Sequence, residues 1–466
     1  MALTAVPARA TRVGMTKPLR IAIAGLGTVG AAVFRILAER RDQIAAQTGR
    51  AIEVAAVSAR DRTKDRGIDL AGVQWFDDPA AMAAAPGIDV LVELIGGAGD
   101  PAKAAVAAAI SSAKHVVTAN KALLAVEGLS FARSAEARGL ALSFEPSAGG
   151  AIPVVKALRE AMAASEITRV SGILNGTCNY ILSRMEAEGM PFAEVLADAQ
   201  KLGYAEADPA ADVDGHDTAH KVALLCALAF GTEVDASAIY VEGISNITPL
   251  DLAMADELGF RIKLLGVAER TAAGIEQRVH PTFVPKTSQL AQVMGVTNAV
   301  SILGSAFGEL TFVGAGAGGN ATASAVIADL TDIAMGKIIP AFGRPAAKLE
   351  KLVQAPMQRH EGGYYIRLQV LDRPGAAAVI AQRMADQGIS LESILQKGRA
   401  VNRLPPADRQ PISAQRNGKP AADLRTSVPV ILITYATAES TVREALDAIA
   451  RAGVIDGAPQ VIRIER

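Results

Sequence analysis

The segment from Gly203 to Lys221, GYAEADPAADVDGHDTAHK, contains several carboxylates and one lysine, and the apolar run VALLCALAF follows it. Asp214 and Asp217 predict a helix N-cap with an acidic partner three residues later, so we expect a helix over residues 215–230. Asp217 and Lys221 would share one face of this helix, where a carboxylate can contact an ammonium four residues away. The apolar run predicts that the helix is mostly buried and that this pair points into a pocket.

The Asp217–Lys221 pair has the chemistry for proton transfer near neutral pH. The positive end of the helix dipole and partial burial both disfavour the charged lysine, whereas Asp217 favours it. A lysine balanced in this way can donate and accept a proton. The alternative is an ordinary ion pair within a helix, which on a surface contributes roughly 0.3–0.5 kcal/mol. The acidic residues that precede the pair favour the catalytic interpretation.

Two histidines of the same segment have a spacing that zinc sites use. His216 and His220 stand four residues apart. The sequence HDTAH lacks the glutamate of the HExxH pattern, and no third ligand is evident. We therefore interpret both histidines as surface residues of the helix.

Length and composition favour a soluble enzyme that acts on a small-molecule substrate. A chain of 466 residues is too long for one core, so two or three domains are expected. A net charge of -1 provides no basic surface for nucleic acid. Cys178 and Cys226 form no CxxC motif, and we find neither a signal peptide nor a membrane span. We expect a cytoplasmic protein with a flexible N-terminal extension over residues 1–18.

A dinucleotide-binding motif follows the first predicted strand, residues 19–24. The order of strand, GLGTVG turn and helix makes the glycine spacing informative. Gly25 would allow the tight turn, Gly27 the approach of a pyrophosphate, and Gly30 the close packing of the helix. The alternative is a glycine-rich turn without a ligand. The cofactor residues predicted in this loop are Gly25, Gly27, Thr28, Val29 and Gly30.

Alternating strands and alanine-rich helices predict an α/β domain of the Rossmann type, with a doubly wound parallel sheet, over residues 19–150. Further strands are expected at residues 52–58, 88–95, 115–119 and 140–145. The second strand leads into SARDRTKDR, where Ser58, Arg60, Arg62 and Lys64 favour NADP and Asp61 allows NAD. A solvated charged loop is the alternative interpretation.

Lys121 and Glu145 follow the fourth and fifth strands of this predicted sheet. Ligands of open α/β sheets bind at the carboxyl ends of the strands, so Lys121 is placed on the ligand side. Glu145 precedes a run of small residues whose carbonyl groups, together with the carboxylate, would suit a hard cation. A turn leading into a helix near Pro153 explains the same pattern.

Residues 151–336 predict an α+β domain for catalysis, substrate binding and oligomerisation. Helices are expected over residues 176–188 and 191–203, and strands over 167–174, 238–243, 260–269, 276–285 and 299–307. The apolar strands predict either a subunit interface or a core. The run GAGAGG, residues 314–319, precedes a helix that we expect to pack on the first domain and to form a further wall of the cofactor site. The alternative for this run is a flexible hairpin turn.

Residues 337–363 are rich in Pro, Lys and Arg and predict a linker. Residues 364–466 follow the order βαββαβ, with strands at 364–371, 389–396, 428–435 and 460–464 and helices at 375–387 and 439–452. This order predicts a ferredoxin-like module. A polar loop over residues 398–426 interrupts it and is expected to be mobile.

The chain resembles the homoserine dehydrogenase family from about residue 19 onward. The motifs that carry the resemblance are GLGTVG, VELIGG, VTANKALLA, FEPSAGGAIPVV, GILNGTCNYIL, the segment GYAEADPAADVDGHDTAHK and GAGAGG. The run LDRPGAAAVIAQRMADQGISL is similar to the opening of an ACT regulatory domain. No aspartate kinase portion precedes these motifs, so the resemblance is to the monofunctional form.

The resemblance implies reversible NAD(P)-dependent interconversion of aspartate 4-semialdehyde and homoserine, in the pathway to threonine, methionine and isoleucine. It implies that Lys221 is the proton donor with Asp217 beside it, that Glu206 binds the substrate ammonium, and that Asp212 is a weaker substrate-side residue. The implied cofactor residues are Gly25 to Gly30, Lys121, Gly203 and Gly318. The implied sodium or other monovalent cation site is Glu145 with the carbonyl groups of Ala148, Gly150 and Ile152.

The ACT resemblance implies allosteric control, with threonine as the expected effector. The ligand would lie at the turn from Asp372 to Gly375, although the long polar loop after Lys397 departs from the family pattern. A homodimer or homotetramer is expected. The alternatives are another Rossmann dehydrogenase of a small amino or hydroxy acid and a nonenzymatic amino-acid sensor. A substrate without an ammonium group would not need Glu206.

Overall fold

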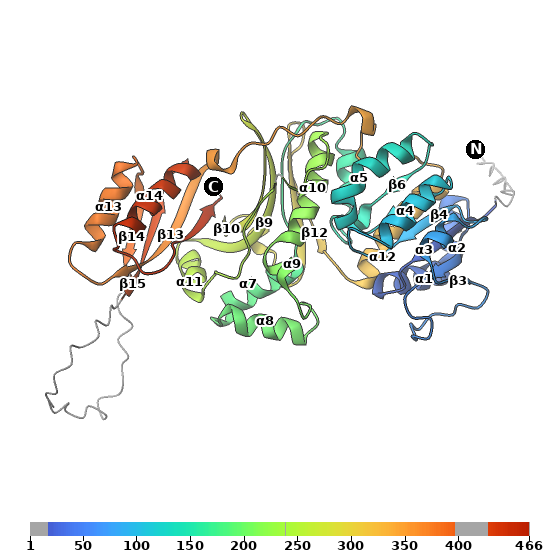
Figure 1. Ribbon diagram of the computed structural model, residues 1–466, viewed down its shortest axis with the longest axis horizontal. Helices are drawn as coiled ribbons and strands as arrows, with labels where there is room; N and C mark the ends of the chain where they lie inside the picture. The colour runs from blue at the N-terminus through green and yellow to red at the C-terminus, as the bar shows by residue number, and fades with distance from the viewer. Residues whose placement is uncertain (1–16, 238, 397–426, 466) are drawn as a thin grey trace, which may run out of the picture. The chain divides into compact units, whose positions relative to one another are not determined.

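The computed structural model describes residues 17–237, 239–396 and 427–465. The chain divides into two compact units (Figure 1). The first unit contains the chain up to residue 244 together with residues 264–280 and 292–355. The second unit contains residues 245–263, 281–291 and 356–466. The predicted polar loop 398–426, and all but the end of the predicted extension 1–18, lie outside the described residues.

The first unit begins with a six-stranded parallel sheet in the order β3-β2-β1-β4-β5-β6. This is the Rossmann order, so the predicted fold of the cofactor domain is confirmed. Its strands are β1 (Leu19–Ala24), β2 (Ile52–Ser58), β3 (Gln74–Phe76), β4 (Val90–Glu93), β5 (His115–Thr118) and β6 (Leu142–Ser143). Its helices are α1 (Thr28–Glu39), α2 (Arg41–Thr48), α3 (Pro79–Ala84), α4 (Ala102–Ser111) and α5 (Lys121–Glu136).

Two strands of this sheet differ from the prediction. The strand expected over residues 140–145 is only two residues long, because Glu145 begins the short 3-10 helix η1 (Glu145–Ser147) and Pro146 has no N–H for a strand partner. The strand β3 was not predicted, since three residues are too few to show alternation.

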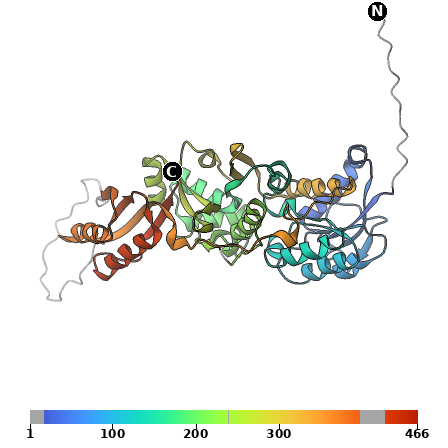
Figure 2. The same cartoon turned by 90° about the horizontal axis from the view of Figure 1, so that it is seen from above.

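The helix α12 (Gly319–Ala334) completes the core of the cofactor domain. Its residues Val326 and Leu330 are fully buried in the same cluster as Ile21 and Ile23 of β1 and Val33 of α1. Figure 2 shows this helix, in orange-yellow, beside the first helices of the chain, in blue. Since α12 is more than 200 residues away from β1 in sequence, the cofactor domain is closed by a late segment of the chain.

The rest of the first unit is a sheet flanked by helices. Within this unit the strand order is β12-β11-β7-β9-β10, and β8 pairs with β10. The strands are β7 (Ile167–Ile173), β8 (Tyr240–Val241), β9 (Phe260–Thr271), β10 (Gly274–Pro285), β11 (Thr297–Gly304) and β12 (Gly308–Ala315). Of β9 and β10, residues 264–271 and 274–280 belong to this unit. The helical segments are α6 (Val154–Lys156), the π-helix η2 (Ala157–Ala161), α7 (Gly176–Glu188), α8 (Phe192–Lys201), α9 (Ala210–Val213) and α10 (His216–Phe230). The edge strand β12 was not predicted, because its sequence GELTFVGA shows no sustained alternation of apolar and polar residues.

The predicted start of α10 was wrong. The N-cap is Gly215, and no side chain caps the helix, so Asp214 does not have the capping role that we expected. Asp214 instead ends the one-turn helix α9, and Gly215 turns the chain with a φ of 88°. A Cβ atom on Gly215 would lie 3.0 Å from Val279 and 3.1 Å from Val241. Glycine is therefore required here by both backbone angle and space.

The second unit contains the predicted βαββαβ module, and the predicted element order is confirmed. Its sheet order is β17-β13-β15-β14, as in ferredoxin-like folds. The elements are β13 (Glu361–Leu371), α13 (Ala376–Asp386), β14 (Leu391–Gln396), β15 (Ser427–Thr434), β16 (Thr437–Ala438), α14 (Glu439–Arg451) and β17 (Gln460–Ile464). Figure 1 shows α13 and α14 on the same face of the sheet.

The second unit also contains α11 (Pro249–Glu257), which was not predicted. Its capping box joins Thr248 and Asp251, and Asp251 is fully buried. The carboxylate of Asp251 accepts hydrogen bonds from Tyr365 and Arg367 of β13. An early segment of the chain is thus built into the late module.

The segment predicted as a linker is largely packed against the first unit. Phe342 and Ala346 are buried, and the backbone N–H of Ala346 donates to Glu136 of α5. Residues up to 355 belong to the first unit. Within the described parts of the chain, no helix is long and apolar enough to cross a membrane.

Candidate active site

Asp217 lies between two lysine side chains. Its Oδ1 atom is 2.9 Å from Lys121 Nζ, and its Oδ2 atom is 2.7 Å from Lys221 Nζ. Lys221 comes from the next turn of α10, whereas Lys121 is the first residue of α5 and follows β5. The structure therefore brings together the predicted catalytic pair and Lys121, which we had expected only to bind the cofactor.

The Lys221 ammonium is held by two acceptors. Besides contacting Asp217, Nζ donates to the backbone carbonyl of Leu174 at 2.5 Å. The side chain of Lys221 is only 10% exposed, so it does not face bulk water. An ammonium has three N–H groups, so one of them remains for a ligand.

Asp217 is a carboxylate at neutral pH. Burial alone would raise its pKa, but the positive charges of Lys221 and Lys121 outweigh burial and hold the pKa of Asp217 well below its usual range. Asp217 can therefore orient the two lysines and balance their charge. It is not a proton donor in this state.

Asn175 joins the two aspartates of the site, and sequence reasoning missed this role. Its Nδ2 atom donates to Asp212 Oδ1 at 2.8 Å and to Asp217 Oδ2 at 3.1 Å. Asp212, the weaker substrate-side prediction, is placed on α9 beside the pair of Asp217 and Lys221. The sequence offers a signal only for the cap that Asn175 forms on α7, because an asparagine before a helix is a typical N-cap.

Glu206 lies on the exposed loop between α8 and α9. This loop is fastened to α7, since Thr177 Oγ1 donates to the carbonyl of Tyr204 at 2.7 Å and the rings of Tyr204 and Tyr180 lie 4.9 Å apart. Gly203, a predicted cofactor residue, turns the same loop with a φ of 76°. The predicted ammonium-binding carboxylate is therefore placed on a loop held by the helix that follows Asn175.

The first glycine loop, GLGTVG at residues 25–30, has the geometry that a dinucleotide requires. A Cβ atom on Gly25 would lie 2.6 Å from the carbonyl of Leu94, and one on Gly30 would lie 2.1 Å from the carbonyl of Gly25. Next to Gly27, by contrast, no atom lies within 4 Å of an added Cβ. Gly27 is also the N-cap of α1, and no side chain makes a capping hydrogen bond there. The site thus offers an open helix N-terminus to a phosphate.

The second glycine loop packs against the first. A Cβ atom on Gly319 would lie 2.9 Å from Thr28 Cγ2, and Arg35 of α1 donates to Asn320 at 2.8 Å. Gly318, a predicted cofactor residue, is the N-cap of α12 and has a φ of 120°. The beginnings of α1 and α12 therefore lie together, as the proposed second wall of the cofactor site requires.

A cavity of about 570 Å³ extends from the first glycine loop. It is lined by Gly25, Leu26, Gly27, Ser58, Ala59, Arg60, Asp61, Lys64, Arg66, Asp77, Pro79, Leu94, Ile95 and Pro101. Arg60 and Lys64, two of the residues predicted to favour NADP, line this cavity and are exposed. Arg62 does not line it, and its guanidinium lies 5.8 Å from the centre of the Trp75 ring.

The acidic residue at this cavity faces its own turn. The Oδ1 atom of Asp61 accepts hydrogen bonds from the backbone N–H of Thr63 at 2.8 Å and from Thr63 Oγ1 at 2.7 Å. Arg66, which we had not singled out, holds the loop by donating to the carbonyls of Leu26, Lys64 and Asp61. The basic side chains of Arg60 and Lys64 are therefore better placed for a ligand than the carboxylate is.

The cavity and the lysine pair are linked by a short path. Ile95 lines the cavity, and the carbonyl of Gly97 accepts a hydrogen bond from Asn120 Nδ2 at 2.7 Å. Asn120 caps α5, whose first residue is Lys121. Lys121 is therefore connected to Ile95, at the edge of the cavity, through Asn120 and Gly97.

Glu145, the first residue of η1, is buried and its carboxylate contacts α6. Its two carboxylate oxygens accept hydrogen bonds from the backbone N–H groups of Val155 at 3.0 Å and Lys156 at 2.7 Å. Burial raises the pKa of Glu145, and these two hydrogen bonds oppose it. Each oxygen keeps a second lone pair, so these contacts are compatible with a cation ligand.

The loop after Glu145 contains the other predicted cation ligands. Ala148 and Ile152 are buried, and Gly150 has a φ of 63°. Asp329 of α12, which the sequence did not indicate, accepts the backbone N–H of Glu145 at 2.9 Å. Burial and the nearby Glu145 charge raise the pKa of Asp329 to about 7.

The histidines of α10 lie near the pair but form no metal cluster. Burial and the charge of Lys121 lower the pKa of His220, whereas His216 is exposed. Among the described residues, no group of three or more His, Cys, Asp or Glu side chains could hold a metal ion. The cation ligands predicted around Glu145 differ from such a group, because all but Glu145 are backbone carbonyl groups.

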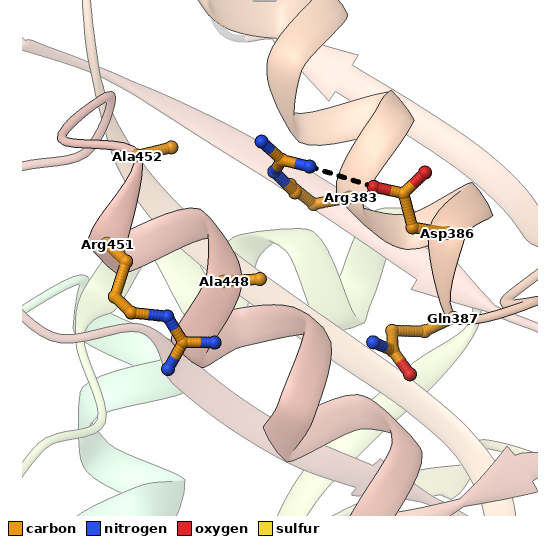
Figure 3. A pocket seen from close by; sticks show the side chains of 6 residues that line it. All are labelled: Arg383, Asp386, Gln387, Ala448, Arg451 and Ala452. Carbon is orange, nitrogen blue, oxygen red and sulfur yellow. Dashed lines mark hydrogen bonds and ion pairs between the residues drawn. The ribbon is translucent and has the colours of Figure 1, made fainter.

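The module of the second unit has a pocket of its own. This pocket, about 370 Å³ in volume, is formed by the ends of α13 and α14 (Figure 3). Arg383 Nη1 is 2.9 Å from Asp386 Oδ2, and Arg451 stands on the other helix. The predicted effector residues Asp372 and Gly375 do not line it and lie at the exposed turn between β13 and α13. Gly375 is the N-cap of α13, with a φ of 87°.

Two family models match the chain. The model described as homoserine dehydrogenase, NAD binding domain, matches residues 25–145, and the model described as homoserine dehydrogenase matches residues 153–331. The matched residues include both glycine loops, Lys121, Glu145, Asp217 and Lys221. The C-terminal module lies outside both matches.

Known relatives and a solved structure are similar over nearly the whole chain. A homoserine dehydrogenase from Pseudomonas aeruginosa is 41% identical over 97% of this chain and 99% of its own length. One from Neisseria gonorrhoeae is 40% identical over 96% of this chain and 99% of its own. The crystal structure of a homoserine dehydrogenase from Thiobacillus denitrificans has a TM-score of 0.87 and 38% identity, and covers 97% of this chain and 99% of that one.

Proposed function

The chain belongs to the homoserine dehydrogenase family, and we propose that it interconverts aspartate 4-semialdehyde and homoserine with Lys221 as the proton donor. The observation that carries this assignment is the pair of contacts from Lys221 Nζ to Asp217 and Leu174. These contacts orient the ammonium and leave one N–H for the carbonyl oxygen of the substrate. Transfer of that proton would stabilise the alkoxide that forms during reduction.

The first glycine loop would hold the cofactor, and the backbone N–H groups at the start of α1 would bind its phosphates. A nicotinamide dinucleotide, when bound, supplies the hydride. Arg60 and Lys64 give the site a preference for NADP, because basic groups accept a 2′-phosphate while Asp61 is engaged by Thr63. Gly203 and Gly318 lie on loops that we assign to the walls of the same site.

Substrate binding uses the carboxylates around α9. Glu206 complements the ammonium of the substrate, and Asp212 assists it from α9. Asp217 remains ionised and holds Lys121 and Lys221 in place. The substrate ammonium is thus bound on the acidic side of the site, and the carbonyl oxygen lies on the lysine side.

A monovalent cation such as sodium would bind Glu145 and the carbonyl groups of Ala148, Gly150 and Ile152. The burial of Glu145 and its free lone pairs support this site. Its role would be structural, because the same loop packs against the second glycine loop: a Cβ atom on Gly150 would lie 2.3 Å from the carbonyl of Gly316.

We also propose an oligomer and amino-acid control. The edge of the first unit's sheet exposes Leu303 of β11 and Leu310 and Val313 of β12, which supports pairing with a second copy of the chain in a homodimer or homotetramer. The ferredoxin-like strand order supports an ACT domain with threonine bound near Asp372 and Gly375. The enzyme would act in the cytoplasm, in synthesis of threonine, methionine and isoleucine.

The test of the catalytic assignment is Lys221→Ala. We expect turnover of aspartate semialdehyde with NADPH to fall at least about 10³-fold, because the proton donor is lost. NADPH binding, measured by fluorescence titration, should stay near that of the wild type. The matched control is Lys114→Ala, since Lys114 also donates to a backbone carbonyl, that of Ile88, but stands outside the site.

The outcome that contradicts the assignment is a Lys221→Ala protein with wild-type turnover. The same assay with NADH in place of NADPH tests the cofactor preference, and its repetition with added threonine tests the effector. A protein that oxidises neither cofactor with aspartate semialdehyde, yet binds threonine, would instead be the nonenzymatic sensor.

A further inference from the structure

We infer that Asn175 is a positioning residue, whose single amide group fixes the spacing between the substrate-side carboxylate Asp212 and the carboxylate Asp217 that orients Lys221. The two N–H groups of one amide match the two acceptors, at 2.8 Å from Asp212 Oδ1 and 3.1 Å from Asp217 Oδ2. These aspartates belong to different helices, α9 and α10. Asn175 therefore connects two elements that face the substrate.

The orientation of this amide is fixed by a third contact. Asn175 Oδ1 accepts the backbone N–H of Cys178 at 2.8 Å, and this bond caps α7. With the oxygen used by the cap, the NH₂ group must point to the other side, where the aspartates lie. The two carboxylates thus use both N–H groups of the amide, and the cap uses one lone pair of its oxygen.

Burial makes these hydrogen bonds effective. Asn175 is only 4% exposed, so little water competes for its amide. Two carboxylates side by side repel each other, and a neutral double donor between them offsets this repulsion without adding a charge. The preceding residue, Leu174, binds Lys221 through its carbonyl. Two consecutive residues after β7 therefore hold both Asp217 and Lys221.

The geometry has a consequence for substrate choice. In an amino aldehyde, the number of carbons between the ammonium and the carbonyl group is fixed. A site that places an acidic group for the ammonium and a lysine for the carbonyl oxygen must keep the same separation to within a fraction of an ångström. Asn175 spans the acidic side and the lysine side, so it would set this separation.

The test is Asn175→Asp in the full chain. A carboxylate caps a helix as well as an amide does, so the cap on α7 is kept. Both hydrogen bonds to the aspartates are lost, and a third carboxylate takes the place of the amide. Because this inference rests on the proposed roles of Asp217 and Lys221, the Lys221→Ala protein is assayed in parallel.

We expect kcat to fall about 10²-fold, since a small displacement of a catalytic group has an effect of this size. The KM for aspartate semialdehyde should rise about 10-fold through Asp212, roughly the lower end of the effect of losing a charge-assisted hydrogen bond. The melting temperature of Asn175→Asp should fall, because a third buried carboxylate repels Asp212 and Asp217, so kcat is measured per folded molecule well below the unfolding transition. Asn175→Ser, which also keeps the cap but offers only one donor, should change kcat and KM in the same direction by a smaller factor.

Wild-type kcat and KM in both folded variants would overturn the inference, because Asn175 would then only cap α7. A rise in KM with unchanged kcat would overturn it as well, because Asp217 would then be independent of Asn175. If Lys221→Ala retains full activity, the proposed function itself fails. If Lys221→Ala is inactive and Asn175→Asp is fully active, only the role of Asn175 fails.

Discussion

Two buried aspartates, one in each unit, accept hydrogen bonds from several donors, yet they are built for different purposes. Asp217 in the first unit contacts the ammonium groups of Lys121 and Lys221, and its side chain is 15% exposed. Asp251 in the second unit accepts from Tyr365 at 2.8 Å and from Arg367 at 2.7 and 3.2 Å, and its side chain is 0% exposed.

The difference lies in the donors and in what remains open. Tyr365 and Arg367 keep their protons at neutral pH, since arginine is always charged and burial, followed by the charge of Asp251, raises the pKa of Tyr365. Thr248 occupies the other lone pairs of Asp251 through its backbone N–H and its hydroxyl. Asp251 therefore stabilises the fold. Asp217 instead orients Lys221, whose ammonium has one N–H group available for a ligand.

The same substitution at both positions gives the strongest test of this comparison. In Asp217→Asn, we expect kcat to fall about 10³-fold, equal to about 4 kcal/mol, because the amide no longer balances and orients Lys221. Steady-state kinetics with aspartate semialdehyde and NADPH measures this change. The comparison breaks if Asp217→Asn keeps its turnover and loses only stability.

In Asp251→Asn, we expect the opposite division of effects. The free energy of unfolding of the second unit should fall by about 3 kcal/mol, because Arg367 is left in the interior without its carboxylate. Urea unfolding followed by circular dichroism measures this loss. The kcat per folded molecule should stay within about twofold, since stability alone changes. A folded Asp251→Asn protein with strongly reduced kcat would contradict the division.

Tyr365→Phe sharpens the comparison at the level of one hydrogen bond. The phenol donates to the Asp251 carboxylate at 2.8 Å, and Arg367 and Thr248 remain when the hydroxyl is removed. We therefore expect a loss of about 1.5 kcal/mol in the free energy of unfolding, less than in Asp251→Asn. A loss equal to that of Asp251→Asn would show that the phenol, and not Arg367, dominates the cluster.

The pH dependence of stability gives the smallest effect. The pKa of Asp217 is lowered by folding from an ordinary value of 3.8. A depressed pKa stabilises the fold above the unfolded value, and this contribution is lost as the pH falls below about 4. Unfolding measured between pH 7 and pH 3.5 should therefore decline less steeply in Asp217→Asn than in the wild type. The pKa of the exposed Asp386 is also lowered, by hydrogen bonds from Gln382 and Arg383, so Asp386→Asn should change the slope in the same direction but by less, because solvent screens this site.

Local sequence signals were sufficient for the cofactor domain and for the pair on α10. GLGTVG after a strand and a spacing of four between Asp217 and Lys221 are short-range patterns, and each sets its geometry within one turn or one helix. The start of α10 was predicted wrongly, because Gly215 is required by Val241 and Val279, which are distant in sequence. Nothing within the segment itself reveals such a contact.

The residues that sequence reasoning missed act over long separations. Asn175 reaches Asp212 and Asp217 across 37 and 42 positions, and Asp251 reaches Tyr365 across 114. An asparagine before a helix predicts a cap, and an aspartate three residues after a threonine predicts a capping box. Their distant partners depend on the tertiary fold, which cannot be predicted from residue spacing within a short segment.

The second unit gathers residues 245–263 and 281–291 as well as the C-terminal part of the chain. A truncation after residue 355 would therefore not remove the second unit completely, because two of its segments precede the truncation. It would strip α11 of Tyr365 and Arg367, leave Asp251 with only its capping contacts to Thr248, and expose apolar surface to the solvent. Proteins from which only the C-terminal module is deleted should therefore aggregate. A transfer of the second unit to another protein should fold only when residues 245–263 and 281–291 are transferred with the C-terminal part.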